Sequence, residues 1–284
     1  MKNVFKSAIV LIVSAFGLTT NAQTQPTENS LLWEVSGNDL TKPSYLYGTM
    51  HMMCEKDFLI KDKVKSAFEK SGVLALEIDF DEPSELQFMQ DMATSSESLS
   101  KVLSKEEYHK LDEFLKGRMG LTASQFENSN LITIMSIVMM KALNCPPKMF
   151  EFEFMGMAAK RKIEIIGLEK AQEQISCFEN SYSNKEFIDQ LEFYDTNFFD
   201  EMSKIYNSEK LDELYAIAVD EKFMDKEAKR LMLDNRNKNW VVKMPELMKK
   251  ESVFFAVGAA HLSGTYGVIN LLKEKGYKVK PILN

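Results

Sequence analysis

Cysteines are scarce in this 284-residue chain, and no excess of basic residues is present. Acidic residues outnumber Lys and Arg by 42 to 35, which gives a net charge of −7. Nucleic-acid binding needs a concentrated basic face, so nucleic acid is not expected as a partner. Only three cysteines occur, and the odd number leaves at least one thiol unpaired within the chain. The spacing does not select a disulfide among Cys54, Cys145 and Cys177.

Several catalytic motifs do not occur. The sequence contains no Gly-x-Ser-x-Gly, no His-Glu-x-x-His, no Walker loop and no Gly-x-Gly-x-x-Gly. These absences argue against a serine hydrolase of the α/β type, a zincin protease, a P-loop nucleotide site and a dinucleotide site. No repeat of 20 to 50 residues is present, which argues against a solenoid.

Long apolar runs are also missing. The run from Ala8 to Leu18 is shorter than the roughly 20 residues of a membrane span. Two lysines precede it and the small residues around Ala22 offer a cleavage site, so residues 1–22 are predicted to be a signal peptide. A membrane anchor or a buried first helix is the alternative. The mature chain, residues 23–284, would be periplasmic or secreted and would have no integral membrane span. A disulfide can form in such an oxidising compartment.

Short apolar segments lie at both ends of the chain, and helical patterns fill most of the middle. Segments 31–35 and 44–47 flank a turn signal and predict a hairpin. Four further strands are predicted at 73–78, 163–168, 253–257 and 277–283. We expect an α/β (α+β) fold, with one central mixed β-sheet built from the N- and C-terminal segments. The large helical section, at about 84–250, is expected to form a cap on a single domain spanning 23–284.

Two of the three histidines end the same short pattern. Gly48-Thr49-Met50-His51 and Gly258-Ala259-Ala260-His261 each follow a predicted strand. Glycine permits a sharp turn, and sites in α/β sheets form beyond the carboxyl ends of strands. Two imidazoles meeting there would suit a divalent transition metal, so His51 and His261 are predicted metal ligands. The alternative is a pair of hydrogen-bonded core histidines. The third histidine, His109, lies in a charged helical segment and is predicted to be at the surface.

Acidic residues follow two of the buried strands. Glu77 ends one strand and Glu169 follows another. An unpaired carboxylate is costly at a buried position, so Glu77 is predicted to be the third metal ligand or the general base. A structural salt bridge to Arg236 is the alternative. Glu169 could bind the metal or act as the base on a bound water. Arg236 could clamp a carboxylate or a phosphate.

At these residues the sequence resembles the TraB/GumN family, which includes the PrgY and TIKI-type metalloproteases. The resemblance rests on residues 45–51, 76–79, 166–169 with Glu173-Gln174 following, and 257–262, with a looser match at Arg236-Asn237 and Trp240. It implies a metal-dependent hydrolase site in which His51, His261 and Glu77 bind a divalent ion of the manganese, cobalt or zinc type. It also implies that Glu77, Glu169 and Arg236 take part in catalysis.

The expected function is therefore an exported metal-dependent hydrolase, a peptidase acting on a peptide or small-molecule substrate. The alternative is a non-catalytic periplasmic protein that binds a ligand, a haem or a metal ion on the same fold. No oligomeric state is predicted.

Overall fold

The computed structural model describes residues 28–284. The predicted signal peptide, residues 1–22, lies outside the described residues. Within residues 28–284, no helix combines the length and the apolar character needed to cross a membrane.

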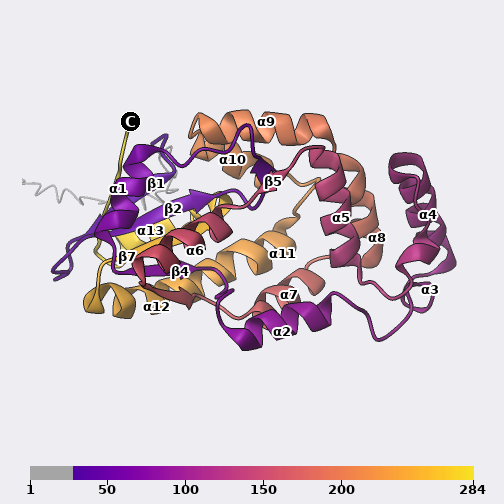
Figure 1. The fold of residues 1–284 in the computed structure, drawn as a ribbon, viewed down its shortest axis with the longest axis horizontal. Helices are drawn as coiled ribbons and strands as arrows, with labels where there is room; N and C mark the ends of the chain where they lie inside the picture. The colour runs from indigo at the N-terminus through magenta and orange to yellow at the C-terminus, as the bar shows by residue number, and fades with distance from the viewer. Residues whose placement is uncertain (1–27) are drawn as a thin grey trace, which may run out of the picture.

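A six-stranded mixed sheet forms the centre of one half of the molecule (Figure 1). In spatial order its strands are β6 (Glu164–Gly167), β4 (Val73–Leu76), β7 (Val253–Gly258), β2 (Ser44–Thr49), β1 (Leu32–Ser36) and β8 (Lys278–Pro281). The first four run parallel, whereas β1 is antiparallel to both of its neighbours. The mixed sheet confirms the predicted fold class, and the pairing of β1 with β2 confirms the predicted hairpin.

One strand of the sheet comes from the middle of the chain, not from its ends as predicted. This strand is β6, which has four residues and pairs with β4 alone at the edge of the sheet. An edge strand needs a partner on one side only, so a short segment inside the helical section can extend the sheet. Its position matters because it brings Glu169 to the same end of the sheet as Glu77.

Helices cover both faces of the sheet. The four that do so are α1 (Asp62–Lys70), α6 (Phe150–Arg161), α12 (Arg236–Lys250) and α13 (Val268–Glu274). Right-handed crossovers place α1 and α6 on one face and α12 and α13 on the other, because the connections step across the sheet in opposite directions. On the first face, Phe68 and Phe154 pack against Phe254 of β7, with ring centroids 5.4 and 5.0 Å away.

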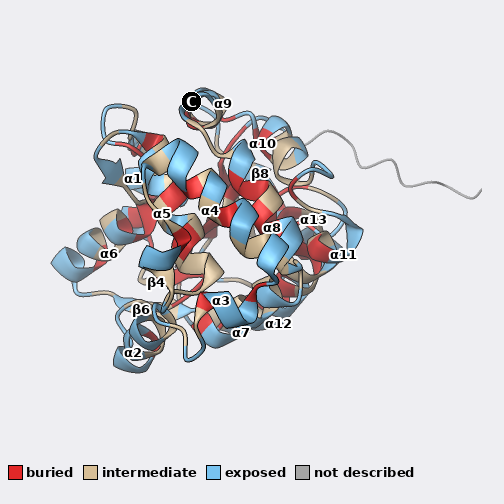
Figure 2. Ribbon diagram, turned by 90° about the vertical axis from the view of Figure 1, so that its right-hand side faces the viewer, coloured by how far each residue is buried: buried red, intermediate tan, exposed pale blue. Residues whose placement is uncertain are grey.

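The other helices lie beside the end of the sheet or extend the molecule away from it, toward the right of Figure 1. They are α2 (Pro83–Met92), α3 (Leu99–Val102), α4 (Lys105–Met119), α5 (Leu131–Leu143), α7 (Ala171–Glu179), α8 (Asn184–Gln190), α9 (Thr196–Asn207), α10 (Leu211–Ala218) and α11 (Lys226–Lys229). Helices α4, α5 and α8 share a small apolar core that includes Leu111, Val138 and Phe187. Figure 2 views this end and shows buried residues on the inner sides of these helices.

A π-helical turn, η3 (Arg230–Asn235), joins α11 to α12 without a break. Such wide turns are rare, and they occur frequently at functional sites. Here the turn ends directly before Arg236.

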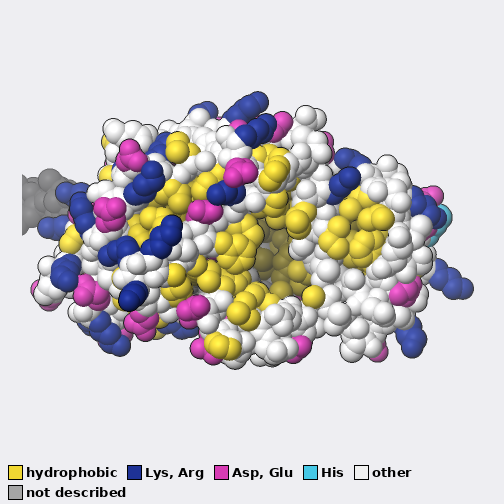
Figure 3. Space-filling view, in the orientation of Figure 1, with side chains coloured by type: hydrophobic (Ala, Val, Ile, Leu, Met, Phe, Trp, Pro, Cys, Tyr) yellow, Lys and Arg dark blue, Asp and Glu magenta, His cyan; other side chains and the backbone are white. Residues whose placement is uncertain are grey.

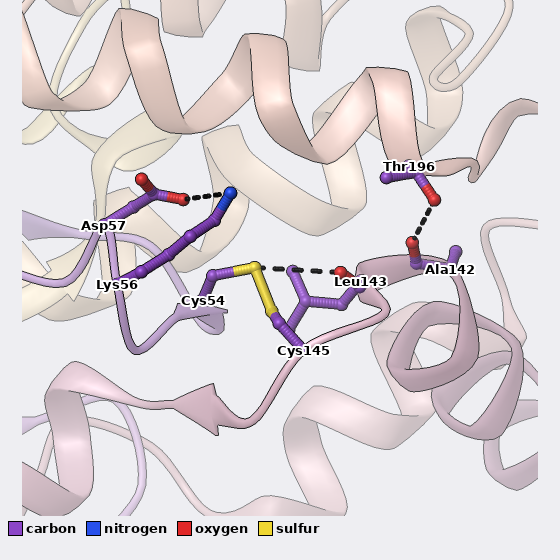
Figure 4. Close-up of a disulfide and its surroundings, with 7 residues drawn as sticks. All are labelled: Cys54, Lys56, Asp57, Ala142, Leu143, Cys145 and Thr196. Atoms are coloured by element: carbon purple, nitrogen blue, oxygen red, sulfur yellow. Dashed lines mark hydrogen bonds and ion pairs between the residues drawn. A yellow bond between two sulfur atoms is a disulfide. The ribbon is translucent and has the colours of Figure 1, made fainter.

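A disulfide links the segment that follows β2 to the helical section (Figure 4). Cys54 of β3 (Met53–Cys54) is bonded to Cys145, which follows α5, and Cys177 is a free thiol. Next to the bond, β3 pairs with β5 (Pro147–Lys148) in a two-stranded sheet. The bond spans 91 positions of sequence and begins three residues after His51, so it ties the segment that follows His51 to the end of α5.

Candidate functional site

The predicted site residues follow the carboxyl ends of the four parallel strands. His51 follows β2, Glu77 follows β4 and Glu169 follows β6, while His261 ends a short 3₁₀ turn, η4 (Ala259–His261), after β7. Because these strands are parallel neighbours, the side chains meet at the end of the sheet where the strands have their carboxyl ends. Arg236 reaches the same end of the sheet from the start of α12. The structure therefore brings together all the side chains that the sequence selected.

Arg236 lies between the two glutamates. Its Nη2 donates to Glu77 Oε2 and to Glu169 Oε1, both at 2.6 Å, and its Nε lies 3.0 and 3.1 Å from the oxygens of Glu169. Gln174 donates to both carboxylates, and Trp240 Nε1 donates to Glu169. All three charged side chains are buried. The salt bridge between Glu77 and Arg236, which the sequence left as an alternative, is thus present.

The two glutamates differ in acidity. Burial alone would raise the pKa of Glu77, but Arg236, the two histidines and the Gly258 N–H together hold that pKa well below its ordinary value. Burial raises the pKa of Glu169 above its ordinary value despite its bonds from Arg236 and Trp240. Glu77 is therefore the firmly ionised member of the pair.

His261 is a buried, neutral imidazole with a defined tautomer. Arg236 Nη1 lies 3.1 Å from His261 Nε2, and Asn237 Oδ1 lies 2.6 Å from Nδ1. A guanidinium can only donate, so Nε2 is the acceptor and Nδ1 carries the proton. Asn237 is itself fixed, because its amide nitrogen donates to the carbonyls of His261 and Tyr266. Burial, followed by the charge of Arg236, lowers the pKa of His261 to about 3.

His51 differs in being exposed and in having an acidic partner. Its side chain is 65% exposed, and its Nδ1 lies 3.5 Å from Glu151 Oε1. Thr49 donates to the same oxygen at 2.9 Å, while Glu151 Oε2 is buried without a hydrogen-bond partner among the described residues. The Glu151 carboxylate raises the pKa of His51 to about 9, against an opposing effect of desolvation.

The sequence did not single out Glu151. It lies in the first turn of α6, where an acid typically offsets the helix dipole in contact with solvent. Nothing in the local pattern indicated that this turn would pack under the end of β2.

Gly258 marks the point where the histidines and Glu77 converge. A Cβ at this position would lie 3.3 Å from Glu77 Oε1, 3.5 Å from His261 Cδ2 and 3.9 Å from His51 Nε2. The Gly258 N–H donates to Glu77 Oε1 at 2.7 Å, and His261 Nε2 lies 3.9 Å from the same oxygen. A side chain at position 258 would therefore intrude on the space that these three groups surround.

The donor types at this point fit a divalent metal ion. Two imidazoles and one carboxylate form a known catalytic zinc set. The Nδ1 of His51 lies beside Glu151, and the Nδ1 of His261 lies beside Asn237. A metal-binding histidine commonly has such an acceptor next to the ring nitrogen that does not bind the metal. As the side chains stand, no group of three or more His, Cys, Asp or Glu within residues 28–284 has metal-site spacing. The Nε2 lone pair of His261 is used by Arg236, so an ion bound there would replace that hydrogen bond.

The third histidine lies outside this centre. His109 is at the surface, as predicted, with a side chain that is 72% exposed.

Comparison with known proteins identifies the family of the chain. No curated protein matches the chain. The model of the TraB/PrgY/gumN family matches residues 31–281, which include every strand of the sheet and both Gly-x-x-His turns. The chain therefore belongs to the TraB/PrgY/gumN family.

Proposed function

We propose that this chain is an exported, metal-dependent hydrolase that cleaves peptide bonds. The observation that carries the proposal is the convergence of His51, Glu77 and His261 within 4 Å of one point above Gly258. In this proposal the three side chains hold a divalent ion of the manganese, cobalt or zinc type. When bound, such an ion supplies a Lewis acid for the scissile carbonyl and lowers the pKa of water.

Arg236 would hold the proposed ligand Glu77 in place and keep it ionised. Arg236 keeps Glu77 ionised, which suits a ligand, and it also borders a cavity of about 260 Å³ shared with both histidines. A guanidinium there could hold a carbonyl or carboxylate oxygen of the substrate.

Glu169 fits a different role. Its raised pKa suits a proton acceptor more than a ligand, and it would exchange its bond from Gln174 for one from the attacking water. Hydrolysis then adds the water oxygen to the carbonyl carbon, breaks the C–N bond and delivers a proton to the leaving amine.

The three histidines provide a matched test. Purified protein, freed of metal and then supplied with Mn²⁺, Co²⁺ or Zn²⁺, is assayed on a library of internally quenched peptides. We expect cleavage by the wild type and by His109→Ala, and a loss of at least about 100-fold in His51→Ala and His261→Ala. Because His51 is 65% exposed, its replacement should leave the circular dichroism spectrum and the unfolding midpoint close to those of the wild type.

Two outcomes would contradict the proposal. Equal activity of His51→Ala and His109→Ala would remove His51 from the reaction. A wild-type protein that binds one metal ion but cleaves no peptide with any of the three metals would favour the alternative, a non-catalytic binding protein.

A further inference from the structure

A cavity with a mostly apolar wall lies beside the candidate site. It measures about 260 Å³, and His51, Arg236 and His261 form one side of it. The rest of the wall is dominated by long apolar side chains, namely Met50, Met202, Met224, Met232, Leu214 and Leu233. Figure 3 shows a hollow with hydrophobic side chains around it near the position of α11, which leads into η3.

The apolar wall is assembled from segments that are far apart in sequence. Met50 belongs to the turn after β2, Met202 to α9 and Leu214 to α10, whereas Met232 and Leu233 belong to the π-helical turn η3. The same turn leads directly to Arg236, so one helix supplies both the apolar wall and the guanidinium at its edge.

The composition of the wall indicates what it can accept. Methionine is unbranched and polarisable, so four of them form a surface that adapts to apolar groups of different shape. A cavity of about 150 Å³ lined by apolar side chains holds a benzene molecule, and this one is larger. A charged group placed against the methionines would lose its hydration without gaining a partner, and is therefore disfavoured.

From this arrangement we infer that the cavity is a specificity subsite for one bulky apolar side chain of a peptide, such as that of Phe, Leu or Met. The inference rests on the proposed function, because it places this side chain next to the bond to be cleaved. In the bound peptide, the apolar side chain would fill the methionine wall while the adjoining backbone lies toward His51, Arg236 and His261.

Two alanines of α10 allow a controlled test. Ala218 lines the cavity, whereas Ala216, two residues earlier in the same helix, is exposed. Ala218→Phe should fill part of the cavity, and Ala216→Phe adds the same side chain outside it.

The first readout is selectivity in cleavage. Pairs of quenched peptides differ at one position near the scissile bond, with Phe in one and Ser in the other. We expect the wild type and Ala216→Phe to prefer the Phe peptide by at least tenfold in kcat/KM at one position, or about 1.4 kcal/mol. Ala218→Phe should lose most of that preference. An equal preference in the two variants, or no apolar preference in the wild type, would overturn the inference.

The second readout does not depend on catalysis. Metal-free protein with ¹³C-methyl methionine is titrated with acetyl-Ala-Ala-Phe-Ala-Ala-amide and with the same peptide carrying Ser in place of Phe. The resonances of Met50, Met202, Met224 and Met232, assigned with Met→Leu variants, should shift with the Phe peptide at concentrations at least tenfold lower. Shifts without any cleavage would support the subsite and refute the hydrolase. Cleavage without shifts and without a preference for Phe would support the hydrolase and refute the subsite.

Discussion

Replacing Arg236 by Met tests the central claim about the site, that one guanidinium pairs with two buried carboxylates. Arg236, Glu77 and Glu169 are 5%, 7% and 8% exposed, so water cannot substitute for the lost cation. Methionine fills a similar volume but leaves both carboxylates without their charged donor. Removing one partner of a buried ion pair costs about 3–5 kcal/mol, because the other charge stays buried.

The expected size of the effect can be measured by urea unfolding. With a urea dependence of about 3 kcal/mol per molar, a loss of that size lowers the unfolding midpoint by roughly 1–2 M at pH 7. A domain has about 5–15 kcal/mol in total, so this loss is a large and readily measured part of the free energy of unfolding. Arg230→Met is the matched control, since Arg230 lies six residues earlier, pairs with Glu227 and is 51% exposed. An exposed pair contributes at most about 1 kcal/mol.

The pH dependence supplies an independent check on the cause. In the wild type the lowered pKa of Glu77 gives stability that is present above its unfolded pKa and is lost as the pH falls. In Arg236→Met the buried carboxyls should instead have raised pKa values, so that stability is lost as the pH rises. The gap between wild type and variant should therefore be larger at pH 7 than at pH 4.

A double variant separates charge from packing. Adding Glu77→Gln to Arg236→Met removes one of the two unpaired charges and should recover at least about 1 kcal/mol. The reasoning is refuted if Arg236→Met matches Arg230→Met in its midpoint, or if its deficit is the same at pH 4 and pH 7.

Three further predictions concern His51, the disulfide and Gly258. Glu151→Gln should move the pKa of His51 from about 9 toward its ordinary 6.5, as measured by NMR titration of the metal-free protein. The stability that this contact gives is present below about pH 6.5 and is lost as the pH rises through about 9. The control is Glu113→Gln, beside His109, which should leave the His51 resonance unchanged. A His51 titration curve in Glu151→Gln that equals the wild-type curve would contradict the assignment. The unfolded protein should show one reactive thiol before reduction and three after it. Reduction should lower the free energy of unfolding by about 2–4 kcal/mol. Three reactive thiols before reduction would disprove the disulfide. Gly258→Ala should weaken metal binding by at least about tenfold in calorimetric titration, because the new Cβ crowds Glu77 and His261. The control is Gly156→Ala, which should bind metal as the wild type does because its Cβ meets nothing within 4 Å.

The strand ends were the part of the site that the sequence could reveal. A glycine at the end of a buried apolar run, followed by a histidine, combines a local signal for a strand with a local signal for a turn. Two such patterns, at His51 and His261, lie on the neighbouring parallel strands β2 and β7. Parallel pairing then brings their ends together without any further information from the residues between them.

The hydrogen bonds and ion pairs of these histidines could not be predicted in the same way. Glu151 and Asn237 lie on helices, where an acid in a first turn and a polar cluster are both common on solvated surfaces. Their roles depend on which helix face packs against the strand ends, and this is set by long-range packing. The disulfide partner of Cys54 was open for the same reason, since Cys145 is 91 positions away and is brought near only by the fold of the helical section.

The helix formed by α11, η3 and α12 accounts for how the cavity and the charged cluster are held together. Met232 and Leu233 line the cavity, and Arg236 Nη1 donates to the Met232 carbonyl at 2.9 Å. Arg236 and Trp240 are four residues apart on one helix face, and both bond to Glu169. A group in the cavity that shifts the backbone of η3 at Met232 would therefore also change the position of the guanidinium that contacts Glu77 and His261. By this route, occupancy of the apolar cavity and the arrangement of the ligating side chains are expected to depend on one another.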